Sequence, residues 1–196
     1  MADSADVPPL VAEDHVCESC DMRYLDLNQA AAAEAIRSYP ARYRSVLAGV
    51  PLSELRRRPA ADVWSMLEYL CHVRDVYDVY CHRIHRTRTE DDPVLEPMRN
   101  TTRAARDRYN EQDPESLLED LTRNAERFAA LVDTIEPAER SRTARRLPGE
   151  TRTLLWLARQ AAHEGIHHLH DIEHIRDQRE PTLRSGNSAR RPAAGP

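Results

Sequence analysis

The chain has 196 residues, of which 40% are hydrophobic and 31% are charged, and it contains only five glycines. This length suits one domain, and the composition is too apolar for a disordered chain and too charged for a membrane protein. The net charge of −5, with all 28 Lys+Arg positions occupied by arginine, gives no reason to expect a nucleic-acid partner.

Both ends of the chain differ from its centre. Residues 1–14 and 179–196 are rich in small and polar residues without apolar periodicity, so we expect flexible tails around one domain at 15–178. No stretch approaches the roughly 20 apolar residues of a spanning helix, and the N-terminus lacks the basic start and apolar core of an export signal. We therefore expect a cytoplasmic protein without a membrane partner.

The central part of the sequence predicts an all-α fold. β-Branched residues are sparse and no useful strand-like alternation occurs. Apolar spacing predicts a first helix at about 27–48, with a break or kink at Pro40. Ser65 and Glu68 have the spacing of a capping box, which predicts the start of a second helix that ends near residue 86. A loop and a short helix are expected within 91–110.

Two further long helices complete the predicted core. Asp113 and Pro114 supply an N-cap and a first-turn proline for a helix that ends near residue 135. A polar connector with the turn signal Pro148-Gly149 follows, and a last helix is expected at about 153–178. Four long amphipathic helices predict a four-helix bundle.

Five of the nine histidines fall in the last predicted helix, at positions 163, 167, 168, 170 and 174. At 100° per residue, all of these except His168 lie within about 60° of one another around the helix axis. We interpret His168, which lies off this stripe, as hydrogen-bonded packing between helices. A solvated helix face is the alternative interpretation of the stripe itself.

The stripe favours a metal site. Imidazoles four residues apart, such as His163 and His167, can chelate one divalent ion of the zinc type. His72 of the second helix is the candidate third ligand. Three protein ligands leave one coordination position open, which is typical of catalytic metal sites.

Carboxylates near these histidines are candidates for orienting the imidazoles through the ring nitrogen that does not bind metal. Asp171, Glu164 and Asp75 all lie within a turn of a predicted ligand, and Asp171 is the favoured one. The capping box already accounts for Glu68.

Near the N-terminus, Cys17 and Cys20 form a single C-x-x-C with His15 just upstream. A closed structural zinc site requires four ligands, so this pair does not complete one by itself. A reducible disulfide and two thiols without a role are the alternatives.

Two segments together resemble the DinB-like (DinB/YfiT) metalloprotein superfamily, in the branch from GC-rich bacteria. The first is W-S-x-x-E-x-x-x-H-x-x-D from Trp64 to Asp75, and the second is H-x-x-x-H-H-L-x-D from His163 to Asp171. The resemblance covers about residues 17–176. Branch relatives often carry Asp-Pro where this chain has Glu164-Gly165.

This resemblance implies a four-helix bundle with one divalent ion, zinc or alternatively nickel or iron, on His72, His163 and His167. It also implies a metal-dependent enzyme that transfers a low-molecular-weight thiol, of the mycothiol type, to a small electrophile. A non-catalytic metal or small-ligand binding module, and a metal-dependent hydrolase or isomerase, stay open. We expect a small-molecule substrate and a homodimer, since such bundles bury their apolar flanks poorly as monomers.

Overall fold

The computed structural model describes residues 7–187, with side chains described as far as residue 178. The outer parts of the two expected tails, residues 1–6 and 188–196, lie outside the described residues. Within the described range, no helix combines the length and the apolarity that crossing a membrane requires.

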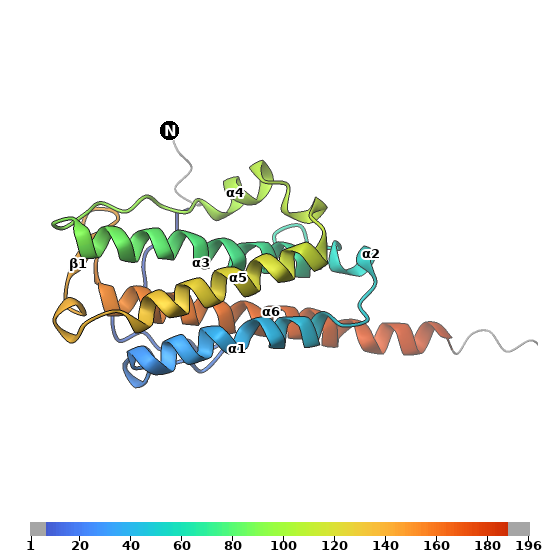
Figure 1. The fold of residues 1–196 in the computed structure, drawn as a ribbon. Coiled ribbons are helices and arrows are strands. Elements are labelled where there is room, and N and C mark those ends of the chain that lie inside the picture. The colour runs from blue at the N-terminus through green and yellow to red at the C-terminus, as the bar shows by residue number, and fades with distance from the viewer. Residues whose placement is uncertain (1–6, 188–196) are drawn as a thin grey trace, which may run out of the picture.

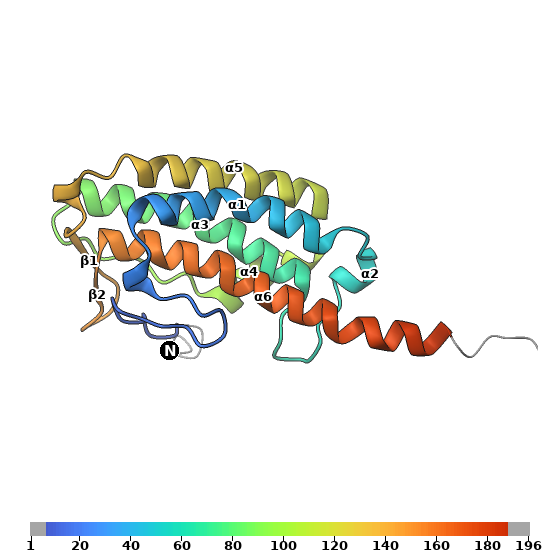
Figure 2. The ribbon, with the colours of Figure 1, turned by 90° about the horizontal axis from the view of Figure 1, so that it is seen from below.

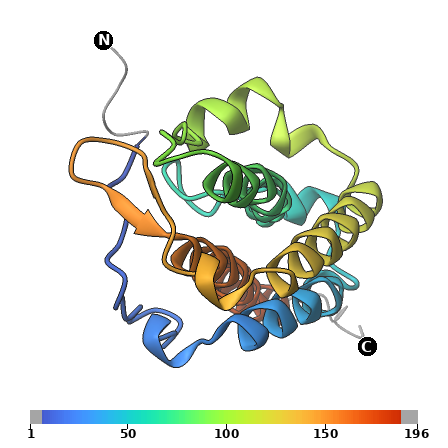
Figure 3. The same ribbon diagram turned by 60° about the vertical axis from the view of Figure 1, so that its left-hand side comes forward.

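Four long helices form the bundle (Figure 1): α1 (Gln29–Leu47), α3 (Met66–Thr89), α5 (Pro114–Asp133) and α6 (Leu154–Asn187). Helix α1 packs against α5 and α6, and α3 packs against the same two helices. Figure 3 shows this four-cornered arrangement nearly end-on. The largest fully buried side chains include Trp156, Tyr24, Tyr43, Tyr77 and Phe128. The predicted all-α four-helix bundle is confirmed.

The helix starts follow the predicted caps. The Glu68 amide donates to the Ser65 hydroxyl at 3.1 Å, and the Ser65 amide donates to the Glu68 carboxylate at 2.9 Å. Asp113 accepts from the Ser116 amide at 2.9 Å at the start of α5. Because caps fix where a helix begins, they also fix which residues of α3 face the core.

Helix α1 runs through Pro40 without a break, so of the break or kink predicted there, the break is absent. A proline inside a helix removes one backbone hydrogen bond, which usually interrupts the helix. Here Pro40 is buried, and α1 lies against two neighbouring helices on either side of it. Tertiary packing of this kind overrides local propensity.

The connections contain short elements. Helix α2 (Leu52–Leu55) follows α1, and helix α4 (Asn100–Arg106) lies over α3 in Figure 1. The polar connector before α6 contains an antiparallel hairpin of β1 (Thr143–Arg145) and β2 (Thr151–Thr153). We predicted no strand there, because three-residue strands are too short to show alternation. Gly149, at φ +81°, supports the predicted turn.

Parts of both expected tails have defined structure in the described residues. Helix α6 continues to Asn187, past the predicted end at 178, and extends beyond the other three helices (Figure 1). Each further residue of a formed helix adds a backbone hydrogen bond, so helix can continue without an apolar stripe.

At the other end of the chain, residues 10–13 are fastened to the start of α6 (Figure 2). The indole of Trp156 donates to the Ala12 carbonyl at 3.2 Å, and the Thr153 amide donates to Glu13 at 2.7 Å. Arg152 donates to the carbonyls of Leu10 and Val11. These residues therefore do not form the loose segment that the composition of 1–14 predicts.

At Gly165, α6 lies in close contact with its neighbours α1 and α3. A Cβ atom at this position would lie 2.3 Å from the Tyr77 hydroxyl and 2.4 Å from the ring of Tyr39. The Tyr43 hydroxyl also donates to the Gly165 carbonyl at 2.8 Å. Glycine is therefore required here by the packing of α6 against α1 and α3.

Gly165→Ala should destabilise the protein despite alanine's better helix propensity. Propensity favours alanine by about 1 kcal/mol, whereas overpacking a core costs about 1–3 kcal/mol. We expect a net loss of up to about 2 kcal/mol in the free energy of unfolding, measured in urea. Tyr77→Phe, which removes the nearest atom, should restore part of this loss. An increase in stability would contradict the packing argument.

Candidate metal centre

One cluster of metal-ligating side chains lies between α3 and α6. The Nε2 atoms of His72 and His168 lie 3.0 Å and 3.1 Å from the same oxygen, Oε2 of Glu164. The three ligand atoms all lie within 4.8 Å of one another. Three donors that converge in this way, two imidazoles and one carboxylate, fit one divalent ion of the zinc type.

The helices place these residues for simple reasons. The capping box at Ser65 sets the register of α3, and His72 lies two turns further along with its side chain buried. On α6, Glu164 and His168 are four residues apart and so lie on one face of the helix. Trp64 and Tyr69 close one side, since Trp64 contacts the ring of His72 and Tyr69 stacks on His168.

A second carboxylate orients His168. Asp171 Oδ2 lies 2.8 Å from His168 Nδ1, which leaves the Nε2 atom of the same ring directed at Glu164. Such a carboxylate partner fixes the ring orientation of a ligating histidine and raises its basicity. The favoured orienting residue, Asp171, therefore contacts a histidine, but this histidine is His168.

The pKa values reflect the same contacts. Burial lowers the pKa of His168, but hydrogen bonds to Asp171 and Glu164 outweigh burial and raise it to about 9. Burial favours a protonated Glu164, yet hydrogen bonds with His168 and His72 hold its pKa well below the ordinary value. Burial lowers the pKa of His72. Without metal, the carboxylates of Glu164 and Asp171 already stabilise the positive charge of protonated His168. The same carboxylates would stabilise a bound cation.

A second cluster lies on the adjoining face of α6. It consists of His163 and His167 together with Cys17 and Cys20 from the N-terminal segment. Cys17 Sγ lies 3.4 Å from His167 Nδ1, and the four ligand atoms all lie within 4.8 Å of one another. His163 is buried, and burial lowers its pKa to about 4, so the ring is neutral at neutral pH.

The structure does not bring the three predicted ligands together. His72 groups with Glu164 and His168, whereas His163 and His167 group with the two cysteines. Glu164, predicted to orient a ligand, lies where a ligand is expected. His168 is the residue that sequence reasoning missed. A signal was present, because Glu164 and His168 repeat the four-residue spacing of His163 and His167 one position later.

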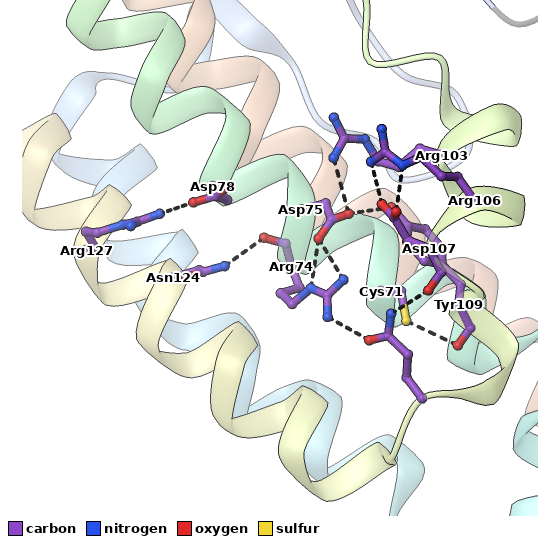
Figure 4. A network of polar contacts seen from close by, with 11 residues as sticks. Cys71, Arg74, Asp75, Asp78, Arg103, Arg106, Asp107, Tyr109, Asn124 and Arg127 are labelled. Atoms are coloured by element: carbon purple, nitrogen blue, oxygen red, sulfur yellow. Dashed lines mark hydrogen bonds and ion pairs between the residues drawn. The ribbon is translucent and has the colours of Figure 1, made fainter.

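Asp75 belongs to a different network, shown in Figure 4. It accepts from Arg74 at 2.8 Å and from the Tyr109 hydroxyl at 2.5 Å, and it pairs with Arg103 of α4. These contacts hold α4 and the turn around Tyr109 against α3. The structure therefore places Asp75 in a structural network rather than beside the ligands.

A cavity of about 320 Å³ opens beside the first cluster. His72, Glu164 and His168 line one side of it, and His163 and His167 also border it. The backbone of residues 7–11 closes another side. Arg83, Arg99 and Arg146 are among the other lining residues, and of these Arg146 is paired with Glu150 at 2.7 Å, so the arginines add positive charge to the wall.

Fold and site together define a four-helix bundle with clusters of metal-ligating side chains on its last helix. The model of the DinB superfamily matches residues 35–172, and the chain belongs to this superfamily. The predicted resemblance to this superfamily is thus confirmed.

Among solved structures, the chain is similar to YfiT from Bacillus subtilis, with a TM-score of 0.69 and 16% sequence identity. The match covers 92% of this chain and 99% of that one. YfiT is described as a probable metal-dependent hydrolase with an unusual four-helix bundle topology. No curated protein matches this chain.

Proposed function

We propose that this protein is a metal-dependent enzyme that holds one divalent ion on His72, Glu164 and His168. The observation that carries this proposal is the convergence of two imidazole nitrogens on one carboxylate oxygen at the wall of a cavity. Two histidines and one glutamate form a known ligand set of catalytic zinc, so zinc is the proposed ion.

When bound, the ion would lower the pKa of a thiol or water that coordinates it and so supply a nucleophile at neutral pH. Glu164 contributes one negative charge to the ligand set, which leaves one positive charge for an anion to neutralise. Asp171 holds the ring of His168 so that Nε2 faces the cluster. Residues 7–11 form part of the cavity wall.

The arginines of the cavity favour an anionic substrate. Arg83 is buried, donates through Nη2 to the Glu96 carbonyl at 2.7 Å and leaves Nε without a hydrogen-bond partner among the described residues. A buried guanidinium donor without a partner is a strong binding position for a carboxylate. These side chains therefore favour a small electrophilic substrate that carries a carboxylate.

The finer proposal is transfer of a low-molecular-weight thiol, of the mycothiol type, to this electrophile. Its support is the sequence resemblance together with a site in which one thiolate would balance the remaining positive charge. Hydrolysis is the second candidate, favoured by the description of YfiT. The homodimer stays a prediction.

The test uses the zinc-loaded protein with N-acetylcysteine or mycothiol and an α,β-unsaturated carboxylate, with the methyl ester of that acid as a matched control. We expect thiol consumption that requires the metal, and a KM at least about tenfold lower for the acid than for the ester, since one charge-assisted pair contributes about 1.5–3 kcal/mol. Turnover of esters or amides without thiol would favour hydrolysis. Metal binding without turnover across the panel would contradict an enzyme.

A further inference from the structure

The second cluster has the ligands of a complete metal site. Cys17 and Cys20 are separated by two residues, and His163 and His167 by three, which matches the C-x2-C and H-x3-H spacings of Cys2His2 zinc sites. These two pairs are far apart in the chain, and the fold brings their four ligand atoms within 4.8 Å of one another.

The hydrogen bonds of His163 determine which of its nitrogens is available. The Tyr24 hydroxyl donates its single proton to Oε1 of Gln160 at 2.5 Å, because Nε2 of Gln160 donates to the Glu164 carboxylate at 2.6 Å. The same hydroxyl lies 3.0 Å from His163 Nδ1 and can only accept from it. His163 therefore carries its proton on Nδ1, and Nε2 presents a lone pair.

That lone pair has no partner. His163 is 8% exposed, and its Nε2 atom is buried without a hydrogen bond among the described residues. An unpaired nitrogen in this position costs free energy unless something binds it. A metal ion bound through Nε2 would satisfy this nitrogen.

The other three ligands are equally well placed. Cys17 is buried beside His167, with its sulfur 3.4 Å from Nδ1, and its amide donates to the Met22 carbonyl at 3.0 Å. This tight loop, with Asp21 at φ +56°, brings Cys20 back beside Cys17. On the far side of its ring, His167 Nε2 lies 3.9 Å from Asp171, beyond hydrogen-bond distance.

The geometry points to a second, closed metal site of the zinc type formed by Cys17, Cys20, His163 and His167. Binding deprotonates both thiols and releases two protons, and the two thiolates cancel the charge of the ion, which suits a buried position. Four protein ligands leave no position for a substrate, so this site is structural. It joins the N-terminal segment to α6 and so holds residues 7–11 over the cavity.

The test measures metal content and the spectrum of the cobalt-substituted protein. We expect about two equivalents of metal in the full-length protein, and Co²⁺ should give the thiolate-to-cobalt charge-transfer bands of a tetrahedral Cys2His2 site. The double variant Cys17→Ser/Cys20→Ser should lose these bands and one equivalent of metal. The control is Cys81→Ser, which removes a half-buried thiol of α3 outside the cluster. This variant should keep the charge-transfer bands and both equivalents of metal.

Two results would overturn the inference. One is a wild-type cobalt spectrum without charge-transfer bands, which needs no variant to fold. The other is a Cys17–Cys20 disulfide in the freshly isolated protein, seen by mass spectrometry after alkylation. Failure of the proposed catalytic site gives a different result. If only the site of His72, Glu164 and His168 fails, the protein binds one equivalent of metal and shows the thiolate-to-cobalt bands. If only the Cys2His2 site fails, the protein binds one equivalent of metal without these bands.

Discussion

His168→Ala is expected to remove the catalytic ion and to lower turnover by more than about a hundredfold, which is the upper limit for loss of a supporting group around a metal. The reason is geometric, since His168 Nε2 is one of the two imidazole nitrogens that converge on Glu164 among the described side chains. His72→Ala should have the same effect. Metal content by elemental analysis and the rate of thiol consumption are the measurements.

The matched control is His167→Ala, which alters the adjacent residue of the same helix. His167 groups with the cysteines, so this variant should keep the ion of the first cluster and turnover, and lose only the second ion together with its thiolate-to-cobalt bands. The sequence predicted a different ligand set, His72, His163 and His167. With that set, His167→Ala would lose the ion and His168→Ala would keep it. If His167→Ala loses turnover and His168→Ala keeps it, the ligands are those predicted from the sequence, and the site proposed from the structure is wrong.

Asp171→Asn is expected to weaken metal binding by about 10–100-fold, the range for partners that orient a metal ligand. An asparagine at this position can still accept from His168 Nδ1, but a neutral amide does not raise the basicity of the ring as the carboxylate does. Competition against a chromophoric chelator measures the affinity.

Glu173→Gln is the control, because it changes a carboxylate of the same helix that lies outside each of the metal-ligating groups. Its metal affinity should match that of the wild type. An Asp171→Asn protein with wild-type affinity would mean that the contact with His168 only caps a local structure and does not support a metal site.

Much of the fold follows from local signals in the sequence. The caps at Ser65 and Asp113 and the apolar spacing of the long helices depend only on neighbouring residues, and the structure confirms them. The hairpin at 143–153 and the unbroken course of α1 through Pro40 do not. They depend on contacts with distant segments, which local propensity cannot represent.

The sequence predicts the chemistry of α6: paired histidines and carboxylates at four-residue spacing, with a histidine on α3 to meet them. It could not determine which pair meets His72, because successive residues point about 100° apart around a helix. The rotation of α6 settles this, and Tyr39 and Tyr77 hold that rotation where they close on Gly165. Only the tertiary structure, likewise, brings Cys17 and Cys20 to His163 and His167, since no local interaction links positions so far apart in the chain.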